Sequence, residues 1–149
     1  MRKWSVEQVR QRLETSTARQ GFNQWLSPRL VEADESGVTL AVDVREDMTQ
    51  HHGYVHGGCV SALADMASAW AGAIASGMDV VTSNFSMHFV SPALGERLIA
   101  KTKVLRAGRT VVTVDVQVFG VAAGGAEKLC AAGIASIAVL AGNGAGARS

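Results

Sequence analysis

The sequence has few of the residues on which several protein classes depend. It contains two cysteines, two prolines and one tyrosine in 149 residues. Cys59 and Cys130 are too few for a disulfide framework, so we expect reduced thiols and a cytoplasmic protein. Fourteen basic and thirteen acidic residues leave a net charge of +1, and no basic tract is present. This balance argues against a nucleic-acid partner.

The sequence also lacks the signs of a membrane or secreted protein. Met1 is followed by charged residues and not by the apolar run of a secretory signal. The apolar run from Val60 to Ile74 is rich in Gly and Ala and contains Asp65, so we expect no stretch to reach the roughly 20 residues that span a bilayer. With 48% hydrophobic residues, we expect one domain, residues 1–149, and no membrane partner.

What the sequence does contain is a nearly uncharged stretch over residues 50–76, which opens with Gly and His. Read as a helix at about 100° per residue, it places apolar side chains along one stripe. These are Val60, Leu63, Ala67, Trp70 and Ile74. Asp65 falls on the opposite side among small residues, so we expect protein to cover both faces. A carboxylate there needs hydrogen-bond partners or a shifted pKa. Asp65 is therefore the first candidate for chemistry, and a structural acid is the alternative.

A thiol and several imidazoles lie close to this stretch. Cys59 follows His56 by three residues, but no further thiolate or ordered carboxylate completes a metal-ligand set. We therefore interpret Cys59 as a small residue packed in a helix. A metal held by His51, His52 and His56 is the alternative, and we expect no metal.

The N-terminal region predicts a short helix. Ser5 and Gln8 have the spacing of a capping box, and apolar residues recur at helical spacing to about Ala18. Residues 1–20 thus form an N-terminal helix, which Gly21 is expected to end. Three apolar residues follow and predict an anchor onto the body, with a ligand-contacting aromatic cluster as the alternative. They are Phe22, Trp25 and Leu26.

Alternating apolar and polar residues predict strands on both sides of the central helix. The expected strands are 30–31, 38–44, 80–90, 96–105, 110–119 and 128–140. The connections after Pro92 are too short for crossover helices, so the sheet should be antiparallel. We predict an α+β fold in which five or six antiparallel strands wrap around a long helix, followed by a flexible tail over residues 141–149.

The stretch from His56 to Asp65, with its His-Gly-Gly and Leu-Ala-Asp motifs, resembles the hotdog-fold acyl-CoA thioesterases, and most closely their PaaI-like, phenylacetyl-CoA branch. The resemblance covers about residues 22–140 and includes the motifs Ser91-Pro92-Ala93, Gly95-Glu96 and Gly108-Arg109-Thr110. It implies the hotdog fold and hydrolysis of an aromatic or medium-chain acyl-CoA. It also implies a homodimer or homotetramer, with coenzyme A entering as part of the substrate and no cofactor.

The resemblance implies further site residues. The branch usually has Asn six residues before the motif histidine, whereas this chain has Gln50, as do the 4-hydroxybenzoyl-CoA thioesterases that pair it with Glu. Gln50 would orient water or thioester, or would be an ordinary loop residue. His52 and Thr82 are pocket candidates by family position alone. The turn Gly108-Arg109-Thr110 is at least a hairpin, and in the family it contacts the nucleotide and phosphates of CoA.

The chemistry of a thioester site can be stated from the residues themselves. Gly57 and Gly58 open a helix, so their N–H groups are free to hold an oxyanion, and one such donor contributes about 3 kcal/mol. His56 either braces this turn or acts as general base. Asp65 lies about 12 Å further along the helix axis, too far to act on the same carbonyl. We therefore expect a site shared between subunits, with Asp65 as nucleophile or general base.

Two other functions remain open at this point. A hotdog-fold hydratase or dehydratase also places a histidine and an acid across a subunit interface. A non-catalytic acyl-CoA-binding sensor would not need a buried acid, so Asp65 counts against it. The sequence does not identify the acyl group.

Overall fold

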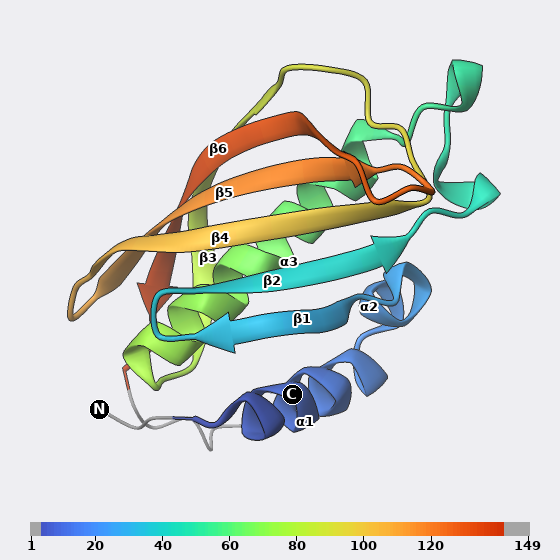
Figure 1. The fold of residues 1–149 in the computed structure, drawn as a ribbon. Coiled ribbons are helices and arrows are strands. Elements are labelled where there is room, and N and C mark those ends of the chain that lie inside the picture. Colours follow the sequence, from blue (N-terminus) through green and yellow to red (C-terminus); the bar gives the residue numbers. More distant parts are fainter. Residues whose placement is uncertain (1–3, 142–149) are drawn as a thin grey trace.

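Six antiparallel strands curve around one long helix in the computed structural model, which describes residues 4–141 (Figure 1). The strands are β1 (Arg29–Asp34), β2 (Gly37–Asp43), β3 (Val80–Phe89), β4 (Arg97–Ala107), β5 (Val111–Val121) and β6 (Glu127–Val139). Their order in the sheet is β1-β2-β4-β5-β6-β3, and every neighbouring pair is antiparallel. The prediction of an antiparallel sheet wrapped around a central helix is confirmed. The expected tail lies outside the described residues, apart from residue 141.

The central helix α3 (Gly57–Ser76) packs its apolar stripe into the core, as predicted. Val60, Leu63, Ala67 and Ile74 are buried against the sheet. Trp70, expected in the same stripe, packs against the core but is only half-buried. Its ring lies on the wall of a cavity beside α3. The face around Asp65 is also half-buried, because the sheet covers only one side of the helix in a single chain.

The apolar character of α3 is strong enough to meet the length and composition of a membrane span. The helix has 20 residues, and its mean hydropathy reaches 1.3, so the expectation that no stretch attains this length was wrong. However, 56% of the apolar 18-residue stretch within this helix is buried inside the protein, because the sheet packs against it. The buried core helices of globular proteins have the same length and apolar composition, so we interpret α3 as the core helix of this fold.

Two helices precede the sheet. The first, α1 (Val6–Ala18), begins at the predicted capping box, in which Ser5 Oγ accepts from the Gln8 N–H and Gln8 Oε1 accepts from the Ser5 N–H. Gly21 was expected to end this helix but instead begins a second one, α2 (Gly21–Leu26). The N–H groups of Arg19 and Gln20 cap α1 by donating to the carbonyls of Ser16 and Thr17, so the chain turns before it reaches the glycine.

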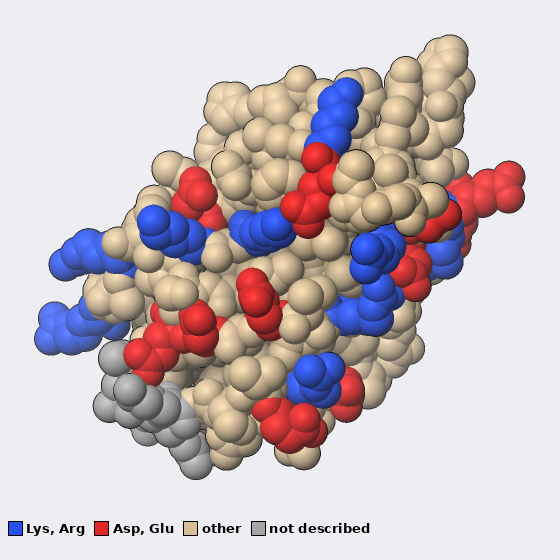
Figure 2. Space-filling view, in the orientation of Figure 1, with Lys and Arg blue, Asp and Glu red and all other residues tan. Residues whose placement is uncertain are grey.

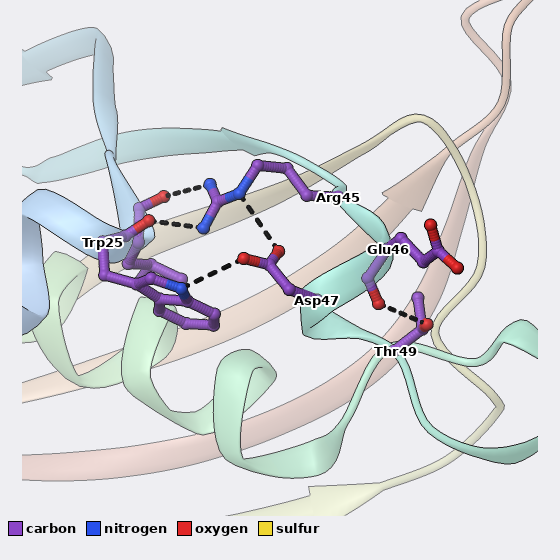
Figure 3. A network of polar contacts seen from close by, with 6 residues as sticks. Trp25, Arg45, Glu46, Asp47 and Thr49 are labelled. Carbon is purple, nitrogen blue, oxygen red and sulfur yellow. Dashed lines mark hydrogen bonds and ion pairs between the residues drawn. The ribbon is translucent and has the colours of Figure 1, made fainter.

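The predicted apolar anchor is divided in two. Leu26 is buried, at 1% exposure, whereas Phe22 and Trp25 are 54% and 38% exposed. Trp25 is held by a polar latch, formed with Arg45 and Asp47 (Figure 3). Arg45 donates to the carbonyls of Trp25 and Leu26, while the Trp25 indole N–H donates to Asp47 at 3.2 Å. The latch ties the end of α2 to the segment that leads toward Gln50.

Two short helical turns, η1 (Glu46–Met48) and η2 (His51–Gly53), separate β2 from α3. Figure 1 shows this segment extending away from the body of the protein. A bridge between Thr49 and Val55 closes its base. The segment therefore forms a projecting loop directly before the first turn of α3.

A β-bulge in β3 determines which of its side chains face α3. Thr82 pairs with Ile137 and Asn84 with Ser136, so Ser83 is an extra residue in the strand. Before the bulge, Val80 and Thr82 are the half-buried side chains, and after it the alternation is shifted by one residue. The bulge thus turns Thr82 inward while the rest of the strand keeps its core-facing register.

The charged side chains are distributed evenly over the face drawn in Figure 2, where basic and acidic groups alternate across the sheet. Several form ion pairs with one another, including Arg29 with Asp43 and Lys101 with Glu127. The face shown therefore carries no extended surface of a single sign.

Candidate active site

Asp65 extends from the middle of α3 toward β3, where it meets Thr82. The Thr82 hydroxyl donates a hydrogen bond to Asp65 Oδ1 at 2.7 Å. The hydrogen-bond partner that a carboxylate at this position needs is therefore Thr82, which its family position had made a pocket candidate. The bond occupies one carboxylate oxygen and fixes its orientation. Asp65 Oδ2 has no bond to another described residue and is the oxygen available for chemistry.

Asp65 and Thr82 lie on the wall of a cavity of about 730 Å³. Helix α3 contributes one wall, the start of β3 another, and the N-terminal segment a third. A cavity of this size is within the range of small-molecule sites. The lining contains two carboxylates, Asp65 and Asp79, among mostly apolar side chains, which suits a reaction on a bound organic substrate.

A second group of predicted residues lies at the first turn of α3. Gln50 and Gly57 line a separate cavity of about 380 Å³, together with the motif Ser91-Pro92-Ala93. The Ala93 carbonyl accepts from the Val55 N–H at 2.8 Å, which holds the two distant segments together. The Phe89 ring lies over Gly57 and closes one side of this cavity. Sequence reasoning missed Phe89, since its alternation pattern marked it only as part of a strand.

The two glycines at this turn have different N–H environments. His56 is the N-cap of α3, and its Nδ1 accepts from the Gly58 N–H at 2.8 Å. The neutral imidazole therefore carries its proton on Nε2, and its basic nitrogen is occupied by the cap. This geometry supports the bracing role of His56. The Gly57 N–H has no acceptor among the described residues, which leaves it as the free donor at the helix N-terminus.

His52 lies outside both cavities, on the projecting loop. Its backbone is left-handed, with φ 64° and ψ 15°, and its ring lies 5.9 Å from that of Tyr54. Tyr54 does line the Gln50–Gly57 cavity. In the described chain, His52 is thus an exposed neighbour of the site and not part of its lining.

The turn Gly108-Arg109-Thr110 joins β4 to β5 near the C-terminal end of α3. The three residues line a third cavity, of about 600 Å³. Met78 and Leu140 belong to the walls of both this cavity and the one that contains Asp65. Arg109 is exposed and has no ion pair with another described residue. A ligand in the Asp65 cavity can therefore extend past Met78 toward a free cation.

The structure thus divides the predicted site residues between separate cavities of one chain. Asp65 and Thr82 line one cavity, the Arg109 turn lines its neighbour, and Gln50 and Gly57 line another, beside the N-cap residue His56. The cavity that contains Asp65 shares no lining residue with the cavity that contains Gly57. This separation agrees with the helix-length argument made from the sequence.

The cysteines and histidines do not form a second reactive centre in the part of the chain that is described. Burial raises the pKa of the Cys59 thiol, and also that of Cys130. A raised pKa keeps a thiol protonated and weakly nucleophilic, although Cys59 lies in the first turn of α3. Among residues 4–141, no three His, Cys, Asp or Glu side chains gather as a metal-ligand group, so the histidine site considered above has no ligand set.

Comparison with known proteins points to one superfamily. Residues 52–121, from the projecting loop to the end of β5, match the thioesterase superfamily. The chain is thus similar to this superfamily over that stretch. A thioesterase family protein from Silicibacter pomeroyi is 29% identical and superposes with a TM-score of 0.81, with 90% of this chain and 99% of that chain covered. Thioesterase superfamily member 2 of zebra fish is 25% identical, with a TM-score of 0.80 over 93% and 100%.

The same comparison confirms the hotdog fold. The PaaI protein of E. coli, from the phenylacetic acid degradation operon, superposes with a TM-score of 0.76 at 20% identity, and 92% of this chain and 97% of that chain are covered. At this identity the likeness concerns the fold. The chain thus has the hotdog architecture in which its sequence motifs were expected to work.

Proposed function

We propose that this protein is an acyl-CoA thioesterase that hydrolyses an aromatic or medium-chain acyl-CoA to the free acid and CoA. The observation that carries the proposal is the Asp65 carboxylate, which lies beside a cavity with one oxygen fixed by Thr82 and the other free. Similarity to the thioesterase superfamily and the resemblance to its PaaI-like branch support the reaction class.

The proposed site is shared between two copies of the chain. Thr82 and Phe89 mark the two half-sites and lie seven residues apart on β3, roughly 20 Å along an extended strand. The strand is at the edge of the sheet, so its outer backbone groups can pair with another strand. Antiparallel pairing of β3 with the same strand of a second copy brings Asp65 of one subunit toward Gly57 of the other. We propose this homodimer, or a tetramer of two such dimers.

In this arrangement each group has a defined role. The Gly57 N–H and the positive end of α3 stabilise the oxyanion that forms on the thioester carbonyl. Asp65 attacks the carbonyl, so that the C–S bond breaks, CoA leaves as its thiolate and a mixed anhydride remains, or it removes a proton from a water whose attack breaks the same bond. Gln50, at the Gly57 end, orients that water or the thioester. Water then completes the hydrolysis, so the reaction needs no metal or prosthetic group, and we propose a cytoplasmic setting for it.

The test is a panel of acyl-CoA substrates with detection of the free thiol, applied to the wild type and to Asp65→Asn. The substitution keeps volume and hydrogen bonding but removes the base or nucleophile, so kcat should fall at least about 100-fold. Oligomeric state and substrate affinity should remain. Hydrolysis in ¹⁸O-water under single-turnover conditions separates the two routes, because label in Asp65 itself indicates nucleophilic attack.

Three outcomes would contradict this proposal. Wild-type protein that binds acyl-CoA but releases no thiol from any substrate would indicate the sensor. Hydration of an enoyl-CoA without thiol release would indicate the hydratase. Full activity in Asp65→Asn would make Asp65 structural and remove the mechanism.

A further inference from the structure

The N-terminal arm, which we define as residues 4–26, lines part of the cavity beside Asp65. Trp4 from the start of the arm and Phe22 and Asn23 from α2 all line this cavity. They face Met66 and Trp70, which extend from α3 on the opposite side. The chemical end of the cavity, at Asp65 and Thr82, belongs to α3 and β3. Its distal boundary therefore belongs to a different part of the chain from its reactive end.

The arm is fixed firmly enough to act as a wall. Val9 and Leu13 of α1 are buried in the core, and so is Leu26 at the end of α2. The Arg45 latch holds the last carbonyls of α2, as Figure 3 shows. The Arg12 guanidinium lies 4.2 Å from the centroid of the Trp4 ring. Three buried anchors and two polar contacts thus hold both cavity-lining parts of the arm.

Phe22 is the residue of the arm whose side chain can change in size without disturbing the core. Its side chain is 54% exposed, so it lies at the rim of the cavity and not in the core. Phe22 packs mainly against Trp25, with ring centroids 6.0 Å apart. A change in its size alters the depth available to a ligand without opening a hole in the packed interior. The rings of Trp4, Phe22 and Trp70 together favour an apolar group of ring-like bulk.

We propose that the N-terminal arm sets the size of the acyl group, with Phe22 as the specificity-determining residue at the distal limit of the acyl cavity. This inference rests on the proposed thioesterase function, because it takes the thioester carbonyl to lie at Asp65. An acyl group of ring or medium-chain length fills the space between Asp65 and the arm. A longer chain meets Phe22 and is excluded.

The test compares Phe22→Ala with Phe22→Trp on phenylacetyl-, hexanoyl-, octanoyl- and dodecanoyl-CoA. Phe22→Ala removes the rim, so kcat/KM for dodecanoyl-CoA should rise at least about tenfold relative to that for hexanoyl-CoA, within the usual range for a changed apolar contact. Phe22→Trp should shift the ratio in the opposite direction. The matched control is Val31→Ala, which truncates a comparably exposed apolar side chain on β1 that lines none of the described cavities. It should leave the profile unchanged.

The outcomes separate the two proposals. If the wild type turns over the panel and both Phe22 variants keep its chain-length profile, the arm does not set acyl size and the inference is overturned. If the wild type hydrolyses nothing, the proposed function fails. The inference is then decided by acyl-CoA affinities, measured by isothermal titration calorimetry. If Phe22→Ala and Phe22→Trp shift the preferred acyl length in binding in opposite directions, the inference is supported. If both variants bind each acyl-CoA with equal affinity, it is overturned.

Discussion

At the scale of single residues, Gly57 allows the oxyanion donor to be removed without disturbing the fold. Gly57→Pro deletes the N–H at the first position of a helix, where proline is well tolerated. The preceding residue, His56, already has φ −59° and ψ 135°, which suits a residue before proline. We expect kcat to fall about 100-fold or more with the helix intact. Turnover assays and circular dichroism measure the two effects.

Gly57→Ala is the matched control for this variant. It keeps the N–H, and its new Cβ would lie 3.5 Å from the Phe89 ring, an ordinary contact. Its kcat should therefore stay within a few-fold of the wild type. Equal losses in the alanine and proline variants would mean that space around Gly57, and not its N–H, is what the reaction needs.

Arg109 supports a second prediction at this scale. Its guanidinium makes no ion pair with another described residue and lies at the turn that lines the third cavity. This cavity is separate from the one at Asp65, where we place the thioester carbonyl. A phosphate contact made there acts equally on ground state and transition state, so Arg109→Ala should raise KM for acyl-CoA and leave kcat nearly unchanged. The KM of a pantetheine thioester, which lacks the nucleotide, should change little. If both substrates lose equally, Arg109 stabilises the hairpin instead.

At the scale of elements, the sequence predicted the strands and α3 well because their apolar periodicities are long. It did not predict what depends on one residue or on tertiary contacts. The bulge at Ser83 turns Thr82 toward Asp65, but the one-residue shift that it causes is easily overlooked in a strand whose alternation holds before and after it. Likewise, Gly21 begins a helix, since Arg45, distant in sequence, supplies the contacts that hold α2.

Gly72 shows how closely α3 approaches the sheet, as its run of small residues indicated. A Cβ at this position would lie 2.6 Å from Ile137 Cγ2, on β6. Gly72→Ala should thus destabilise the fold by about 1–3 kcal/mol through overpacking, partly offset by about 1 kcal/mol of helix propensity. Urea unfolding measures the net change, for which we expect a loss.

The control for Gly72 is Gly124→Ala, in the loop between β5 and β6. An added Cβ there meets no atom within 4 Å, so its free energy of unfolding should change little. In an Ile137→Ala background the cost of Gly72→Ala should shrink, since the clashing Cγ2 is absent. An unchanged cost would place the strain elsewhere.

At the scale of the whole molecule, the sequence predicted that one chain holds two incomplete half-sites. The 12 Å estimate came from helix geometry alone, and the structure places Asp65 and Gly57 on separate cavities. The sequence could not predict the cavity beside Asp65, because its walls come from α1, α2, α3 and β3 and no local pattern records their meeting. For the same reason Phe22, Trp25 and Leu26 were interpreted first as an apolar anchor, with a ligand-contacting cluster as the alternative.

The shared site leads to a prediction about mixed subunits. Asp65→Asn disables one half-site of a chain, and Gly57→Pro disables the other. In a heterodimer of these two variants, one active site combines both defects, while the other combines the intact Gly57 of one subunit with the intact Asp65 of its partner. Co-expression with two different affinity tags, followed by purification on both, isolates this species. Symmetry then predicts about half the wild-type turnover per dimer, although each parent alone is nearly inactive.

The alternative is a site completed within one chain, and it gives a different result. Each subunit of the heterodimer would then carry one fatal substitution, so the mixed dimer would be as inactive as its parents. The control is a heterodimer of Asp65→Asn with wild type, which also retains one intact site in the shared arrangement. Recovery in the mixed variant to the level of this control therefore requires that Asp65 and Gly57 act across the interface. An inactive mixed dimer beside an active control would place the whole reaction within one subunit.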